Sequence, residues 1–356
     1  MPEIEGPILG IETSCDETAA AVVAGGRKVL SSVVASQAEI HAQYGGVFPE
    51  VASRQHTLYI IPTVEQALAE AAISPEVLGG VAAVHGPGLP GSLVVGVNFA
   101  KGLAMAAGLP FVGINHLEAH IYTVWTLEEE RDLIEFPLLA LIASGGHTLL
   151  VLMRDHGEYL TVGETLDDAA GEAFDKVARL SGLGYPGGPA IQAAAEGGSA
   201  TAVELPRAWL PRTYDFSFSG LKTAALRLLA GDDPGKLVHA GVDASYWQEE
   251  SPVPLSDFAA SFQAAVVEVL AEKAARAAEE HRARLLVLTG GVAANLALRE
   301  EIRARTQLPV IYPPPALCTD NGVGVAAAGW FRLQRGERSG WDLDIVSRAR
   351  LGDRSG

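Results

Sequence analysis

The chain has 356 residues, a length that predicts two domains or two lobes. Hydrophobic residues make up 48% and charged residues 19%, so the chain can bury a large core and is not intrinsically disordered. The formal net charge is −17, which excludes a surface that holds nucleic acid by overall positive charge. A nucleic acid would have to meet a local basic patch or a partner protein.

The two cysteines, Cys15 and Cys318, lie far apart in the sequence, which is typical of a reducing compartment and not of a disulfide framework. The acidic N-terminus lacks the basic and then apolar order of a signal peptide. The most apolar stretch, residues 93–114, contains Asn98, Lys101 and Pro110. We interpret it as a buried helix followed by a strand, because a membrane-spanning helix needs about 20 apolar residues without a charge such as that of Lys101. These features predict a soluble, cytoplasmic protein.

An apolar strand, a small polar turn ending in threonine and a second apolar strand occur twice along the chain. The first copy has strands at 8–11 and 19–23, and the second has strands at 137–142 and 149–153. Two such copies predict a duplicated architecture, since a solenoid would repeat at a shorter period.

Three other strands each lead through a glycine- or proline-containing loop into a helix. The predicted helices cover 93–107, 292–303 and 323–331, after strands at 81–84, 285–289 and 310–312. Free backbone N–H groups at a helix start favour a phosphate. Together with the two polar turns, these loops predict a nucleotide-sized cleft between two α/β lobes. Residues 258–281 have the apolar spacing of a helix that packs on the core.

The segment His116-Leu-Glu-Ala-His120 carries two histidines four residues apart. In a helix both would lie on one face, close enough to ligate one metal ion. Glu118 would point about 180° away from them, unlike the glutamate of a metalloprotease helix. Two histidines at chance spacing are the alternative interpretation.

A metal held by two histidines needs a further ligand, often a carboxylate. Asp320 lies in a loop before a predicted helix and is a candidate. An aspartate at such a position is also a common helix N-cap. The sequence leaves both interpretations open.

Further motifs combine glycines with polar residues. The turn 144–148 could hold a phosphate or carbonyl, although a plain hairpin would need only its glycines. Residues 163–176 carry five carboxylates in what we interpret as one helical stretch with a solvated face. The following segment 184–189 is rich in glycine and proline, which suggests backbone that approaches a ligand.

Eight motifs occur in order along the chain: GIETSCDET (10–18), GGVFPEVASRQH (45–56), NHLEAH (115–120), SGGHT (144–148), DDAAGEAFDK (167–176), FSFSGLK (216–222), TGGVAAN (289–295) and TDNG (319–322). Taken together, they resemble one family, TsaD (also called YgjD or Gcp), the tRNA adenosine threonylcarbamoyltransferases. The resemblance runs from about residue 8 to residue 330.

The resemblance implies an α/β fold of two related lobes of the actin/Hsp70/sugar-kinase (ASKHA) type around a nucleotide-binding cleft. We expect an N-terminal lobe at 1–125, onto which the C-terminal helix 320–335 packs back, and a C-terminal lobe at 126–319. Residues 336–356 would form a basic tail, interpreted either as a frayed solubilising terminus or as a contact for tRNA.

The resemblance also implies the functional residues. His116, His120 and Asp320 would bind one metal ion per subunit, usually iron(II), with zinc or another divalent metal as the alternative. The adenylate-bearing substrate would be bound by Ala143, Ser144, Gly145, Gly146, His147, Asp175, Gly188 and Asn295. Many members carry an acidic residue where this chain has Gln192, whose amide can still bind a ribose hydroxyl.

The implied activity is transfer of a threonylcarbamoyl group from threonylcarbamoyl-AMP to the exocyclic amine of the adenosine 3′ of the anticodon, in tRNAs that read codons starting with A. The implied partners are tRNA, a TsaB-like paralogue and a TsaE-like ATPase, with no membrane. The alternatives are an ASKHA-type small-molecule kinase or ATPase, a zinc metallopeptidase, and a non-enzymatic scaffold.

Overall fold

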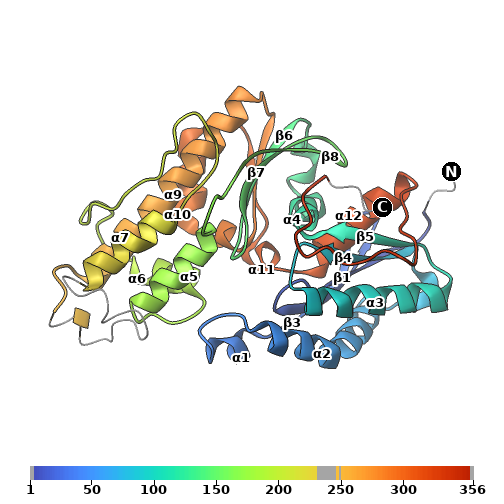
Figure 1. The fold of residues 1–356 in the computed structure, drawn as a ribbon. Coiled ribbons are helices and arrows are strands. Elements are labelled where there is room, and N and C mark those ends of the chain that lie inside the picture. Colours follow the sequence, from blue (N-terminus) through green and yellow to red (C-terminus); the bar gives the residue numbers. More distant parts are fainter. Residues whose placement is uncertain (1–3, 231–245, 248–249, 353–356) are drawn as a thin grey trace. The chain divides into compact units, whose positions relative to one another are not determined.

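The computed structural model describes residues 4–230, 246–247 and 250–352. The chain divides into two compact units, each with a five-stranded sheet (Figure 1). The first unit comprises residues up to Phe136, Met153–Leu160 and Ile311 onward, and the second comprises Pro137–Leu152 and Thr161–Val310. The C-terminal helix α12 (Gly322–Gln334) therefore belongs to the first unit.

The sheet of the first unit has the strand order β3-β2-β1-β4-β5. Strand β1 pairs antiparallel with β2 and parallel with β4. Its strands are β1 (Ile8–Glu12), β2 (Glu17–Ala24), β3 (Lys28–Ser36), β4 (Gly80–Gly86) and β5 (Phe111–Asn115). Its helices include α1 (Ala38–Ala42), α2 (Pro49–Glu70), α3 (Pro90–Ala107), α4 (His116–Tyr122) and α11 (Pro315–Cys318), besides α12.

Helices cover both faces of this sheet, α2 and α3 on one and α12 on the other (Figure 1). Leu9 and Ile11 of β1 belong to the core cluster that includes side chains of α2 and α3. Gly10, between them, faces α12, and a Cβ there would collide with the backbone of Ala326. Since neighbouring strand residues point to opposite faces, one apolar strand serves both layers.

The second unit repeats this arrangement. Its sheet has the order β10-β9-β6-β7-β8, which read in reverse matches the first sheet strand for strand. The strands of this sheet are β6 (Leu138–Ala143), β7 (Thr148–Asp155), β8 (Glu158–Glu164), β9 (Leu285–Thr289) and β10 (Val310–Ile311). The end of β7 and the start of β8, within Met153–Leu160, belong to the first unit. The helices of the second unit include α5 (Ala170–Leu180), α6 (Gly187–Ala194), α7 (Ser219–Ala230), α9 (Leu255–Glu280) and α10 (Leu296–Arg305). The equivalent strand orders confirm the predicted duplication.

Two helix predictions in this unit are wrong. The helix predicted at 292–303 is a 3₁₀ turn, Gly291–Ala294, followed by α10, because the side chain of Asn295 caps α10 by accepting from Leu298 N. The carboxylate-rich stretch 163–176 is not one helix either. Glu164 ends β8, and α5 starts only at Ala170, so the earlier carboxylates lie before the helix.

The C-terminal segment is bonded to the first sheet through most of its length. The N–H of Val346 donates to the carbonyl of His85 at 2.8 Å, and the side chain of Asn115 donates to the carbonyl of Arg350 at 3.1 Å. Trp341 stacks on Phe111. A frayed terminus is therefore the wrong interpretation for residues 339–350, since apolar contacts and backbone hydrogen bonds hold them. Residues 353–356 of the predicted tail lie outside the described residues.

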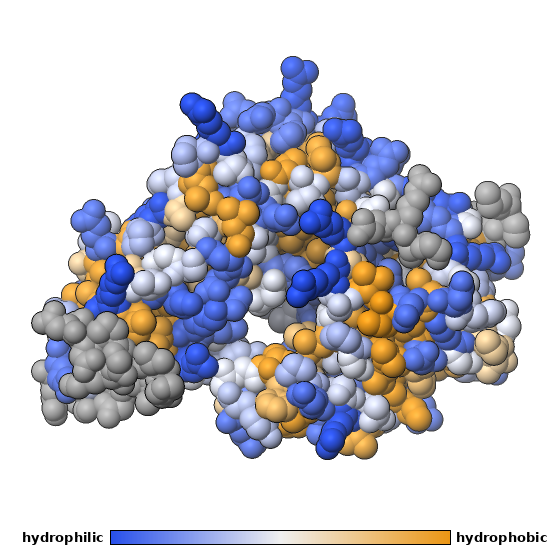
Figure 2. All heavy atoms as spheres, viewed as in Figure 1, coloured by the Kyte–Doolittle hydropathy of each residue, from blue (hydrophilic) through white to orange (hydrophobic). Residues whose placement is uncertain are grey.

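Within the described part of the chain, no helix has both the length and the apolar character that crossing a membrane requires. On the face shown in Figure 2, apolar residues lie among hydrophilic ones.

Candidate metal centre and substrate loops

Helix α4 positions the two histidines. It starts directly after β5, and Asn115 caps it, with Oδ1 accepting from Leu117 N at 2.9 Å. All seven residues of α4 are buried, and the rings of His116 and His120 lie 4.7 Å apart between centroids. The segment is thus helical as predicted, with both imidazoles on one face.

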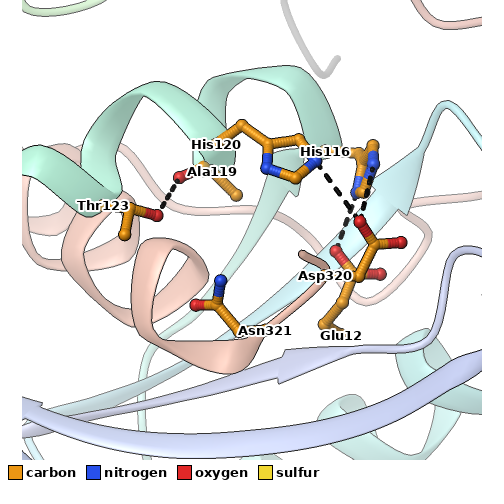
Figure 3. Close-up of a pocket in the computed structure, with 7 residues that line it drawn as sticks. All are labelled: Glu12, His116, Ala119, His120, Thr123, Asp320 and Asn321. Carbon is orange, nitrogen blue, oxygen red and sulfur yellow. Dashed lines mark hydrogen bonds and ion pairs between the residues drawn. The ribbon is translucent and has the colours of Figure 1, made fainter. Parts of the chain in front are cut away.

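Asp320 lies in the loop before α12, and its side chain points to the two histidines (Figure 3). Its Oδ1 is 3.3 Å from His120 Nε2 and 3.7 Å from His116 Nε2. The N-cap of α12 is the next residue, Asn321, whose Oδ1 accepts from Val323 N and Gly324 N. The alternative of an Asp320 cap is therefore wrong, and its carboxylate is available to the histidine cluster.

The donor atoms of His116, His120 and Asp320 lie within 4.8 Å of one another, around a cavity of about 10 Å³. Such a cavity has room for about one ion or water molecule. At bond lengths of about 2.0–2.2 Å, neighbouring ligand atoms of one metal ion lie about 3–3.5 Å apart. The two distances to Asp320 Oδ1, 3.3 and 3.7 Å, are close to this range. Two imidazoles with one carboxylate suit a borderline transition metal better than magnesium. The residues fit a divalent metal ion.

Glu12 completes this cluster, and sequence reasoning did not single it out. It ends β1, and its Oε2 lies 2.8 Å from Nδ1 of His116, with Ser14 Oγ at 3.1 Å from the same nitrogen. A carboxylate can only accept, so Nδ1 carries the proton and Nε2 is turned to Asp320. A second carboxylate behind a ligating histidine is the usual way to fix its tautomer and orientation. The polar residues that begin with Glu12 at the end of β1 were the sequence feature that could have indicated this role.

The centre is strongly acidic. Burial and the nearby carboxylates of Asp320 and Asp16 raise the pKa of Glu17 to about 10. Burial alone would lower the pKa of His116, but Asp320 and Glu12 more than offset it and raise that pKa to about 9. Such crowded carboxylates are costly without a cation, so the electrostatics agree with the donor set.

The predicted substrate residues lie in the second unit. Ala143 ends β6, and the turn after it is closed by Ser144, whose N–H donates to the carbonyl of His147 at 2.8 Å. Gly145 and Gly146 at its tip are exposed, neither has a left-handed φ, and a Cβ on either would meet nothing within 4 Å. The fold of the described residues does not itself require glycine there.

Asp175, Gln192 and Asn295 connect the surrounding loops. Asp175 Oδ1 accepts from Gly187 N at 2.7 Å, and Gln192 Oε1 accepts from Leu296 N at 2.8 Å. The side-chain amide of Asn295 donates to Gln263 at 2.7 Å. These side chains join the start of α6 to α5 and the start of α10 to α6.

Close backbone contacts place the segments at Gly290 and Gly171 next to the turn that follows Ala143. A Cβ on Gly290 would lie 2.5 Å from the carbonyl oxygen of Ala143, and one on Gly171 would lie 2.5 Å from that of Ser144. Gly188, in contrast, has open space around its Cα. The predicted substrate residues therefore gather around one group of loops.

The family model described as "TsaD: tRNA N6-adenosine threonylcarbamoyltransferase" matches residues 28–327. The chain belongs to this family. It is 57% identical over 346 residues to the tRNA N6-adenosine threonylcarbamoyltransferase of Thermomicrobium roseum, covering 95% of each chain. It is 50% identical over 354 residues to the Symbiobacterium thermophilum protein of the same name, covering 98% of each. The family identified from the motifs is thus confirmed.

Solved structures agree on the fold. HypF of T. kodakarensis aligns with a TM-score of 0.57 at 15% identity, over 94% of this chain and 48% of its own. Full-length HypF in a phosphate- and nucleotide-bound form aligns with a TM-score of 0.58 at 13% identity, over 98% of this chain and 48% of its own. The predicted ASKHA fold of this TsaD family member is confirmed.

The metallopeptidase alternative requires a glutamate on the metal face of α4. Glu118 lies on the other side of the helix, fully buried, with Oε2 at 2.9 Å from Nη2 of Arg332. It cannot activate a water molecule at the histidine cluster, so the geometry contradicts that alternative.

Proposed function

We propose that this chain transfers the threonylcarbamoyl group of threonylcarbamoyl-AMP to the exocyclic amine of the adenosine 3′ of the anticodon, in tRNAs reading codons that begin with A. In this reaction the amine nitrogen bonds to the carbamoyl carbon, the bond from that carbon to the phosphate oxygen breaks, AMP leaves, and the amine loses a proton. Family membership supports the reaction class.

The observation that carries the proposal is the convergence of His116, His120 and Asp320 around one cavity, with Glu12 behind His116. These three residues would hold one iron(II) ion, or zinc or another divalent metal. Such an ion supplies Lewis-acid stabilisation of negative charge on an oxygen of the substrate. Glu12 keeps the Nε2 lone pair of His116 directed to the centre.

The loops of the second unit would bind the adenylate. The backbone at Gly145 and Gly146, which is exposed, and at Gly188, which is half-buried, can approach a phosphate or sugar, because no side chain occupies that space. The amide of Gln192 keeps its NH₂ group for a ribose hydroxyl while its oxygen accepts from Leu296 N. Bound there, the substrate is oriented by Ala143–His147, Asp175 and Asn295, which the hydrogen bonds described above hold in place.

The acceptor and partners follow from the family. With a net charge of −17, the chain has little general attraction for a polyanion. We therefore expect a TsaB-like paralogue and a TsaE-like ATPase to contribute to binding of the tRNA in the cytoplasm.

The proposal is tested in cells depleted of this protein, by nucleoside mass spectrometry of their tRNA. We expect loss of threonylcarbamoyladenosine and full restoration by the wild type and by His281→Ala, a control at the end of α9. His116→Ala should not restore it. Restoration by His116→Ala would reject the metal centre and keep the pathway. No loss on depletion, with no second copy in the cell, would reject the transferase.

A further inference from the structure

Glu118 and Arg332 form a buried ion pair that no step of the proposed reaction uses. Glu118 is 0% exposed. Its Oε1 accepts a hydrogen bond from Arg332 Nε at 3.2 Å, and its Oε2 lies in ion-pair contact with Arg332 Nη2 at 2.9 Å. Tyr159 OH donates to the same carboxylate at 2.8 Å. Two side chains, those of Arg332 and Tyr159, thus hold the carboxylate.

The pair joins the two helices that carry the candidate metal ligands. Glu118 lies on α4 between His116 and His120, on the opposite side of the helix. Arg332 lies in the last turn of α12, and Asp320 lies just before Asn321, the N-cap of that helix. Arg332 lies ten helical steps after Gly322, the first residue of α12, which is a rise of about 15 Å. The ion pair and the ligand cluster therefore connect α4 to α12 at two distant points.

A buried ion pair of this kind does little for stability, because removing two charges from water costs about as much as their attraction returns. Well-packed apolar residues would hold the helices together equally well. Because Nε and Nη2 of Arg332 each contact a different oxygen of the Glu118 carboxylate, the contact has a defined direction. That direction determines the rotation of α4 about its own axis.

Rotation matters at this site because the imidazole nitrogens lie far from the helix axis. With the Cα atoms at about 2.3 Å from the axis and the rings further out, a rotation of about 20° moves Nε2 by about 2 Å. Metal–ligand distances tolerate only about 0.2 Å. A small rotation of α4 would therefore separate both histidines from Asp320.

We infer that Glu118 and Arg332 are positioning residues, which set the rotation of α4 so that His116 and His120 converge with Asp320 on one metal ion. Tyr159 supports the carboxylate from β8. The inference rests on the proposed metal centre, and it gives Glu118 a role away from the reacting atoms.

The test uses the full chain and cobalt(II) alone as the probe. Its absorption spectrum reports the geometry of the ligands, and a titration gives affinity and stoichiometry. Wild type should bind one ion, and His116→Ala should bind none at the same site. Glu118→Gln and Arg332→Lys should each weaken binding at least tenfold and change the spectrum. Tyr159→Phe, which keeps the ion pair, should have a smaller effect.

Each single variant leaves a buried charge or a looser contact, so loss of folding could imitate loss of positioning. The double variant Glu118→Gln/Arg332→Met removes both charges, and its thermal unfolding should stay close to that of the wild type. We expect its cobalt affinity to remain at least tenfold weaker. A double variant with the affinity and spectrum of the wild type would overturn this inference and leave the proposed metal centre in place. A wild type that binds no cobalt at His116 would overturn the proposed metal centre as well.

Discussion

Substitution of Glu12 by glutamine gives the sharpest test of how the candidate centre is built. The Oε2 atom that lies 2.8 Å from His116 Nδ1 accepts a hydrogen bond from it. Glutamine can keep its oxygen on the N–H of Ser14, which Glu12 Oε1 now accepts. Its NH₂ group would then face Nδ1, making that nitrogen an acceptor and placing the imidazole proton on Nε2. The histidine would present an N–H group where the metal requires a lone pair.

The loss of such a partner behind a ligand costs about 10–100-fold in metal affinity, or about 1.4–2.8 kcal/mol. We expect Glu12→Gln to bind zinc or cobalt that much more weakly in a calorimetric titration, with one site retained. Its imidazole should also titrate below the wild-type pKa of about 9, because one of the raising carboxylates is gone. Asp16→Asn, an acidic neighbour in the same turn, is the matched control. Equal affinities for wild type and Glu12→Gln would refute the orienting role.

Two further predictions concern the proposed substrate loops and the pH dependence of stability. Gly145→Val should leave thermal unfolding nearly unchanged, within about 0.5 kcal/mol, because its Cβ meets nothing in the described chain. AMP affinity should nevertheless fall, and unchanged affinity would exclude this turn from the adenylate site. His156 stacks on Phe331, and burial lowers its pKa to about 4. The unfolded chain binds this proton more readily, so stability should decline as the pH falls from about 6.5 towards 4. Denaturant unfolding of His156→Phe should show a shallower decline, and an identical pH profile would contradict the assignment.

Much of the fold was predictable because short, local sequence patterns determine its elements. The strand–turn–strand blocks at 8–23 and 137–153 are apolar runs interrupted by one polar turn, and both became paired strands. The four-residue spacing of His116 and His120 was equally local, since any helix places such residues on one face.

What the sequence could not resolve depended on competition between neighbours or on distant contacts. Asp320 and Asn321 can each cap a helix, and only the backbone at α12 shows that Asn321 takes the cap. Asn295 ends one turn and starts another helix by the same capping chemistry inside an apparently continuous helical run. Glu12 acts on His116 across more than a hundred residues of sequence, and no local spacing encodes that contact.

The candidate centre also explains why α12 is built from small residues. Aspartate is a short ligand, so Asp320 reaches the histidines only if the start of α12 lies close to α4. Gly324 makes that approach possible, since a Cβ there would collide with the carbonyl oxygen of Ala119 between the two histidines. On its other side the helix rests on Gly10 of β1, the strand that ends in Glu12. The packing of the first unit and the assembly of the centre therefore depend on the same condition. The backbones of β1, α4 and α12 must lie close enough together for Glu12, the two histidines and Asp320 to contact one another.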